Sequence, residues 1–192
     1  MPTTRSRRLA AALAVAAAVG TTTILAATSS ASAHEGHGAH ASRSLPAGAR
    51  AALARLAKDV APYADPAAAQ AAGWFPVGGC AALPDGSAAM GYHYLNPALL
   101  AGPPDPAKPP MLVYVPALDG GLTLGAVEWF VPDADQDLST DDDRPSVLGV
   151  PFDGPMPGHE PGMPVHYDLH AWVGVANPAG ILQPFNPAVS CP

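Results

Sequence analysis

Residues 165–175 have the sequence VHYDLHAWVGV, in which polar side chains alternate with apolar or aromatic ones. This period of two predicts a β-strand, because successive side chains of a strand point to opposite faces. The polar face of this strand carries His166, Asp168 and His170, followed by Trp172. The segment therefore predicts both a β fold and a row of possible metal ligands on one face of a sheet.

Other segments with the same character surround this strand, and Pro/Gly-rich loops separate them. The expected strands are residues 89–94, 111–115 and 122–131, with 181–183 as a further candidate. The chain contains 19 glycines and 24 prolines, which is too many for a helical bundle. We find no βαβ alternation, so we predict a mainly β (α+β) fold: a small antiparallel β-barrel or sandwich with short N-terminal helices.

Helical signals are confined to short stretches, most of them near the start of the domain. Leu53, Leu56 and Val60 have the spacing of a helix face, and Pro62 ends that pattern. Asp65 followed by Pro66 predicts the N-cap and first residue of a second helix, and Asn96-Pro97 repeats the signal for a single turn.

The first 33 residues resemble a secretory signal peptide. Arg5, Arg7 and Arg8 form a basic start, residues 9–25 are apolar, and Ala31-Ser32-Ala33 has the small residues of a cleavage site. The alternative is an uncleaved anchor, but this stretch is rich in Ala, Gly and Thr and is only weakly apolar. We predict a secreted or envelope-exterior protein, exported by the Sec route or by the twin-arginine route that Ser6-Arg7-Arg8-Leu9 resembles.

The remaining chain divides into a tail and one domain. Residues 34–45 (HEGHGAHASRSL) lack large apolar side chains other than one leucine, and we expect them to be a disordered, His-containing tail. Residues 46–192 then form a single globular domain. The length of 192 residues leaves room for no more than that.

The charge balance argues against some classes of partner. The chain carries 9 Lys+Arg and 16 Asp+Glu, a net charge of −7, and removal of residues 1–33 takes away three arginines and no acid. Such an acidic protein lacks the basic face that nucleic-acid binding requires. No segment after the signal is apolar enough to cross a membrane, and the sequence identifies no protein partner.

The only two cysteines are Cys80 and Cys191. Export to an oxidising compartment predicts a disulfide between them. A thiolate metal pair is the alternative, but the chain has no CxxC or neighbouring Cys-His spacing to support it.

A possible metal site combines the polar face of strand 165–175 with two other strands. His93 and Glu128 each lie inside a predicted strand, where a charge is costly unless it is paired or ligated. With Asp168 and His170 they can form a site of two histidines and two carboxylates, and His166 is a weaker candidate. The alternative is a metal-free, buried His/carboxylate network that specifies the fold.

A second set of candidate ligands points to copper. Met156, His159 and Met163 have the spacing MxxHxxxM, and thioether and imidazole ligands suit Cu(I). Cleavage after Ala33 would expose His34 as an N-terminal histidine, whose amine and imidazole can chelate Cu(II). The alternatives are a surface loop whose methionines pack on the domain, and an adventitious histidine cluster in the tail.

Four sequence motifs resemble those of an uncharacterised family of exported bacterial proteins that is common in actinobacteria. The motifs are Met90–Pro97 (MGYHYLNP), Asp168–Trp172 (DLHAW), Asn177–Gly180 (NPAG) and Asn186–Cys191 (NPAVSC). The resemblance covers residues 60–192 and implies export and a single domain, but no mechanism.

We therefore expect an exported, metal-binding module that holds copper or zinc. The alternative is a metal-free structural or interaction protein, and a further alternative is a small metal-dependent enzyme, which needs a coordination position open to water. The chain has no GxSxG motif and no phosphate-binding glycine loop, so catalytic residues other than the metal ligands remain unassigned.

Overall fold

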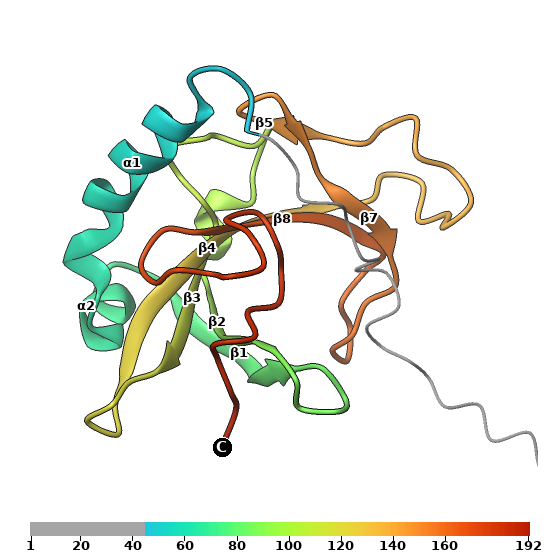
Figure 1. Ribbon diagram of the computed structural model, residues 1–192. Helices are drawn as coiled ribbons and strands as arrows, with labels where there is room; N and C mark the ends of the chain where they lie inside the picture. The colour runs from blue at the N-terminus through green and yellow to red at the C-terminus, as the bar shows by residue number, and fades with distance from the viewer. Residues whose placement is uncertain (1–44) are drawn as a thin grey trace, which may run out of the picture. The chain divides into compact units, whose positions relative to one another are not determined.

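A computed structural model describes residues 45–192, which form a curled, antiparallel half-barrel sheet with few helices (Figure 1). The six-stranded sheet has the order β1-β2-β3-β4-β8-β7, and a separate two-stranded sheet pairs β5 with β6. The strands are β1 (Phe75–Ala82), β2 (Ala89–Leu95), β3 (Met111–Pro116), β4 (Leu122–Pro132), β5 (Ser146–Val147), β6 (Val150–Pro151), β7 (Asp153–Met156) and β8 (His166–Trp172). The predicted mainly β class is confirmed.

The helices lie before and within this sheet, and two of them, α2 and η2, begin at the caps that the sequence predicts. They are α1 (Ala49–Val60), the 3-10 turn η1 (Ala61–Tyr63), α2 (Pro66–Ala71) and the 3-10 turn η2 (Pro97–Leu99). Asp65 accepts a hydrogen bond from the backbone N–H of Ala67 (2.9 Å), and Asn96 accepts one from Ala98 (3.1 Å). Both side chains therefore satisfy N–H groups that a helix start leaves open.

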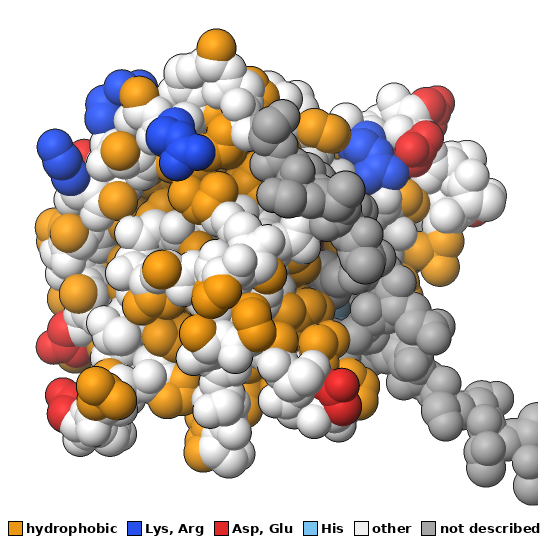
Figure 2. All heavy atoms as spheres, viewed as in Figure 1, with side chains coloured by type: hydrophobic (Ala, Val, Ile, Leu, Met, Phe, Trp, Pro, Cys, Tyr) orange, Lys and Arg blue, Asp and Glu red, His pale blue; other side chains and the backbone are white. Residues whose placement is uncertain are grey.

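One face of the sheet forms the main core with α1. Leu53, Leu56 and Val60 of the helix pack into the same cluster as Tyr167 and Leu169 of β8. The charged side chains of α1 point away from this core, and Figure 2 shows basic side chains gathered over the helix beside a largely uncharged surface. This helix is amphipathic in the way that its sequence period predicts.

The other face of the sheet combines polar side chains with a smaller apolar cluster. That cluster contains Val113, Ala126 and Trp172 from the sheet and Val189 from the C-terminal segment. The segment is held in place because Trp172 Nε1 donates to the Gln183 carbonyl (2.6 Å) and Asn186 pairs through its backbone with Ala89. The polar face of β8 is thus buried beneath other parts of the chain.

The predicted disulfide is confirmed: Cys80 in β1 and Cys191 are bonded, with a sequence separation of 111. The bond joins the C-terminal segment to an edge strand of the sheet. Among residues 45–192 there is no free cysteine.

Several sequence-based boundaries differ from the structure. The candidate strand 181–183 is wrong, because Ile181 and Leu182 form a turn and Gln183 belongs to no strand. The strand expected over 165–175 is limited to His166–Trp172. Strands β1, β5, β6 and β7 were not predicted. Leu45, which we assigned to the disordered tail, packs against the main core because it is the tail's one large apolar side chain.

The signal peptide (1–33) and residues 34–44 of the tail lie outside the described residues. Within the part of the chain that is described, no helix has the length and apolar character needed to cross a membrane.

Candidate metal centre

Three strands contribute one side chain each to a buried cluster on the polar face of the sheet. His93 comes from β2, Glu128 from β4 and His170 from β8. Glu128 and His170 are direct cross-strand partners, whereas His93 lies on the far side of β3. Strands two apart are separated by about 10 Å, so the side chains of His93 and Glu128 lean toward each other across β3.

The donor atoms of this cluster form a nearly equilateral triangle. Glu128 Oε2 lies 3.1 Å from His93 Nε2 and 3.2 Å from His170 Nε2, and the two Nε2 atoms are 3.4 Å apart. In a tetrahedral site with bonds of about 2.0–2.1 Å, neighbouring donor atoms lie roughly 3.3 Å apart. The three atoms therefore occupy positions that match three corners of a metal coordination tetrahedron.

The cluster is buried, and one of its three members, Glu128, carries a negative charge. Glu128 is 4% exposed and His170 is 1% exposed, while the His93 side chain is 12% exposed. Burial alone would raise the pKa of Glu128, but the adjacent imidazoles of His170 and His93 outweigh this effect and hold that pKa well below its usual value. Glu128 is accordingly a carboxylate, the form that binds a cation.

Asp168, the fourth predicted ligand, is not part of the donor triangle. Its Oδ1 lies 4.0 Å from His170 Nδ1, which is the ring nitrogen outside the triangle. A carboxylate near the second nitrogen of a ligating histidine orients the ring and increases its basicity. This position suits Asp168 for orienting His170 rather than for direct ligation.

A small cavity adjoins the triangle, and the predicted Met/His loop forms part of its wall. The cavity has a volume of about 40 Å³, little more than one water molecule occupies in the liquid. Its lining includes His93, Glu128, Met111, His159 and Met163. Two members of each of the ligand groups that the sequence suggested separately therefore line one cavity.

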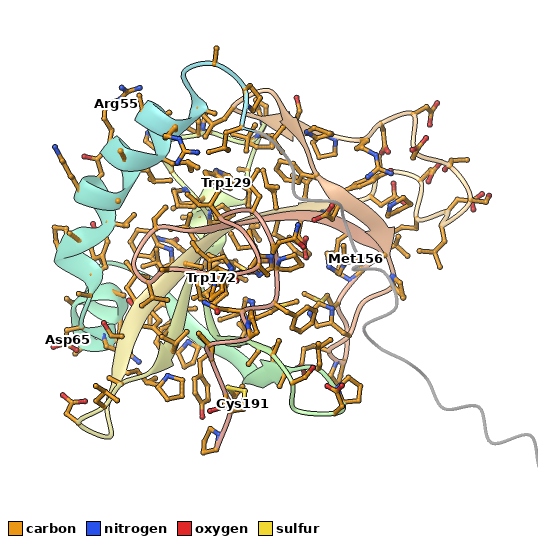
Figure 3. All side chains as sticks on the ribbon, viewed as in Figure 1. Arg55, Asp65, Trp129, Met156, Trp172 and Cys191 are labelled. Atoms are coloured by element: carbon orange, nitrogen blue, oxygen red, sulfur yellow. A yellow bond between two sulfur atoms is a disulfide. The ribbon has the colours of Figure 1, made fainter. Side chains whose placement is uncertain are left out.

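The remaining candidates lie close by or outside the described residues. His166 is fully buried, stacks on Phe130 (ring centroids 4.7 Å apart) and contacts His159 edge to face (5.4 Å). Burial lowers the pKa of His166, which favours the neutral ring. Met156 lies in β7 as the cross-strand partner of His166 (Figure 3). His34 lies outside the described residues.

The cavity wall also contains two possible ligands that were not predicted, Met111 and Glu160. The sequence around Met111 is typical of an ordinary core residue of a strand. Met111 lies beside the cavity because β3 pairs with β4 in a register that places it opposite Glu128. Glu160 also lines the cavity. Its Oε1 lies so close to Gly78 that a β-carbon at that position would be only 2.6 Å from this oxygen. Its position next to His159 in the sequence was the one available signal.

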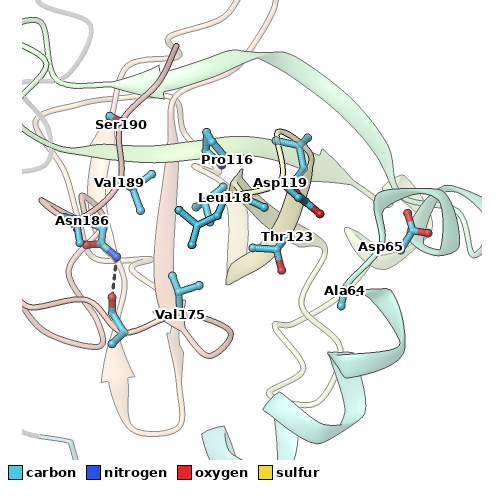
Figure 4. Close-up of a pocket in the computed structure, with 15 residues that line it drawn as sticks. Ala64, Asp65, Pro116, Leu118, Asp119, Thr123, Val175, Asn186, Val189 and Ser190 are labelled. Carbon is cyan, nitrogen blue, oxygen red and sulfur yellow. Dashed lines mark hydrogen bonds between the residues drawn. The ribbon is translucent and has the colours of Figure 1, made fainter.

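A larger cavity lies elsewhere in the described part of the chain. It is an open groove of about 970 Å³ lined by the β3–β4 turn, Val175 and residues 186–190 (Figure 4). None of the three donor residues lines it, and its wall combines apolar side chains with Asp65 and Asp119. The candidate metal centre and the groove are therefore separate features.

Within residues 45–192, His93, Glu128 and His170 are the one group of three His, Cys, Asp or Glu side chains whose donor atoms converge this closely. The chain matches no protein-family model, no curated protein and no solved structure. The resemblance based on the four sequence motifs thus stays a prediction, and function must be inferred from the site itself.

Proposed function

We propose that this protein is an exported module that binds a divalent transition-metal ion, zinc or copper, through His93, Glu128 and His170. The observation that carries the proposal is the triangle of donor atoms, with sides of 3.1, 3.2 and 3.4 Å. Imidazole nitrogens suit both metals, and a carboxylate oxygen completes a common zinc set. The disulfide between Cys80 and Cys191 supports export, because such bonds persist in oxidising compartments.

The small cavity supports a second candidate function, that of a metal-dependent enzyme. Three protein ligands with a fourth position left to water are typical of catalytic zinc sites, whereas structural sites use four protein ligands. The cavity of about 40 Å³ beside His93 and Glu128 has room for one such water. A larger substrate would require movement of the loop that carries His159.

The test compares His93→Ala with His159→Ala, a matched control because both imidazoles line the same cavity. In both variants His34, His37 and His40 are also replaced by Ala, which removes metal binding by the tail. We expect His93→Ala to weaken Zn²⁺ binding at least 100-fold in competition with a chelator, because one of three ligands is lost. His159→Ala should bind Zn²⁺ as the parent does.

Equal Zn²⁺ and Cu²⁺ affinities for the parent and His93→Ala would contradict the proposal. The same holds if the parent binds both ions no more tightly than a surface pair of histidines. Either result would favour the metal-free His/carboxylate network. Elemental analysis of the protein isolated from its export compartment then identifies which of the two metals it holds.

A milder effect is expected for Asp168→Asn, because Asp168 contacts the ring of His170 rather than the donor triangle. Loss of an orienting carboxylate typically weakens metal binding by about 10–100-fold. We expect a Zn²⁺ affinity between those of the parent and His93→Ala, measured by the same competition. An affinity as low as that of His93→Ala would instead make Asp168 a ligand.

A further inference from the structure

His166 has a side chain that the proposed divalent site does not use. The residue is fully buried on the polar face of β8, and its Nδ1 lies 3.0 Å from the Pro164 carbonyl oxygen. A carbonyl oxygen can only accept a hydrogen bond, so Nδ1 carries the proton and donates it. The neutral ring then presents a lone pair at Nε2.

That lone pair has no hydrogen-bond partner among the described residues, although the atom is buried. Leaving a buried acceptor unsatisfied is destabilising, so a native protein is expected to provide this atom with a partner. A histidine that donates Nδ1–H to a backbone carbonyl and directs Nε2 elsewhere has the tautomer and fixed ring typical of a metal ligand.

The strand partner of His166 and the two rings that contact it are soft or aromatic side chains. Met156 is its cross-strand partner and is 2% exposed, His159 contacts the ring edge to face, and Phe130 stacks on it. Met163 lines the same cavity as His159. Thioether and imidazole ligands select Cu(I) over zinc or calcium.

The loop between β7 and β8 brings His159 and Met163 to this place by folding back on itself. Met163 N–H donates to the Glu160 carbonyl (3.0 Å). A β-carbon on Gly158 would overlap the Met163 carbonyl oxygen, so the two backbones are in contact. Glycine at position 158 is therefore required for the loop to close.

We propose that His166, His159 and the thioethers of Met156 and Met163 form a second metal site that binds Cu(I) beside the divalent site. Two of these ligands, His159 and Met163, line the cavity that His93 and Glu128 also line. The two sites have no ligand in common, so the proposal does not require an ion on Glu128. It predicts that the two sites can be emptied separately by substitution.

The experiment measures Cu(I) affinity without oxygen, by competition with a chromogenic Cu(I) chelator, in the full chain with His34, His37 and His40 replaced by Ala. We expect the parent to bind one Cu(I), and His159→Ala and the double variant Met156→Leu, Met163→Leu to bind it at least 100-fold more weakly. His93→Ala should retain Cu(I) while it loses Zn²⁺. X-ray absorption of the Cu(I) form should show sulfur scattering in the parent and none in the methionine double variant.

Unchanged Cu(I) affinity in both His159→Ala and the methionine double variant would overturn the proposal. So would loss of Cu(I) from His93→Ala, which would mean that copper occupies the divalent site. Because His159 is half-buried in a loop, its variant should fold, and an unchanged far-UV circular dichroism spectrum checks this. Loss of Zn²⁺ from His159→Ala would also overturn the proposal, since it would make His159 a fourth ligand of the first site.

Discussion

Replacement of both Cys80 and Cys191 by alanine is expected to lower the free energy of unfolding by about 4–5 kcal/mol. The disulfide closes a loop with a sequence separation of 111, and a cross-link of this span removes roughly that much conformational free energy from the unfolded chain. Domains of this size are commonly stable by only about 5–15 kcal/mol, so the variant should be close to unfolding at 37 °C.

The native state should also change, because the bond fixes the end of the C-terminal segment. Val189 packs on the smaller apolar cluster, and Asn186 donates through Nδ2 to the Ala176 carbonyl (3.0 Å). Once the bond is lost, these contacts alone hold the segment. We expect faster amide hydrogen exchange at residues 186–191 than in the central strands.

Urea unfolding of the double variant measures this effect, with Ser190→Ala as a control in the same exposed part of the segment. The control should unfold at the parent's midpoint. The denatured, unreduced parent should yield no titratable thiol. Two thiols, or a loss of less than about 1 kcal/mol in the double variant, would contradict the assigned role of the disulfide.

The elements that the sequence predicted are those whose period and caps are local properties. Helix α1 follows from the spacing of Leu53, Leu56 and Val60, and the strands β3, β4 and β8 follow from apolar or alternating runs. Strand β1 has the sequence FPVGGCAA, which lacks both an alternating pattern and β-branched residues except Val77. It forms because β2 provides a partner for its backbone, and this partner cannot be read from the segment itself.

The candidate site shows the same division between local and long-range information. Alternation correctly placed Asp168 and His170 on one face of β8, but it could not show which residue of β4 lies opposite each of them. The register pairs Glu128 with His170, whereas Phe130 is opposite Asp168. That register, which depends on the whole sheet, decides which carboxylate joins the donor triangle.

The position of the loop between β7 and β8 could not be predicted from the sequence either. The spacing of Met156, His159 and Met163 suggested a copper site apart from the strand residues. In the structure the loop lines the cavity beside Glu128, because it folds back after β7 and packs over β1. A sequence contains no direct signal for this contact between a glycine of β1 and the loop's Glu160.

Glu128→Gln is expected to abolish the stabilisation that a divalent ion gives to this protein. At an ion concentration about 1,000 times the Kd, binding stabilises a folded protein by about 4 kcal/mol, which raises the Tm of a domain of this size by roughly 10 °C. Glutamine keeps the shape of the side chain but removes the single negative charge of the donor triangle. We therefore expect the parent's Tm to rise with Zn²⁺ or Cu²⁺ and that of the variant to stay within about 1 °C.

Glu160→Gln is the matched control, since this carboxylate lines the same cavity but is not among the three converging donors. Its Tm should respond to the ion as the parent's does. A shift in Glu128→Gln equal to that of the parent would contradict the assignment of Glu128 as a ligand.

The response of the Tm to the ion distinguishes the two interpretations of the cluster. If Glu128 serves only a buried hydrogen-bond network, its ion pairs with His93 and His170 stabilise the fold, and breaking such a pair costs about 3–5 kcal/mol. Glu128→Gln would then lower the Tm without metal, and the parent would not respond to the ion. If Glu128 is also a metal ligand, the same ion pairs are lost, and the Tm without metal falls as well. The parent's Tm should then rise when the ion is added and that of the variant should not, so the two proteins should differ more with metal than without it.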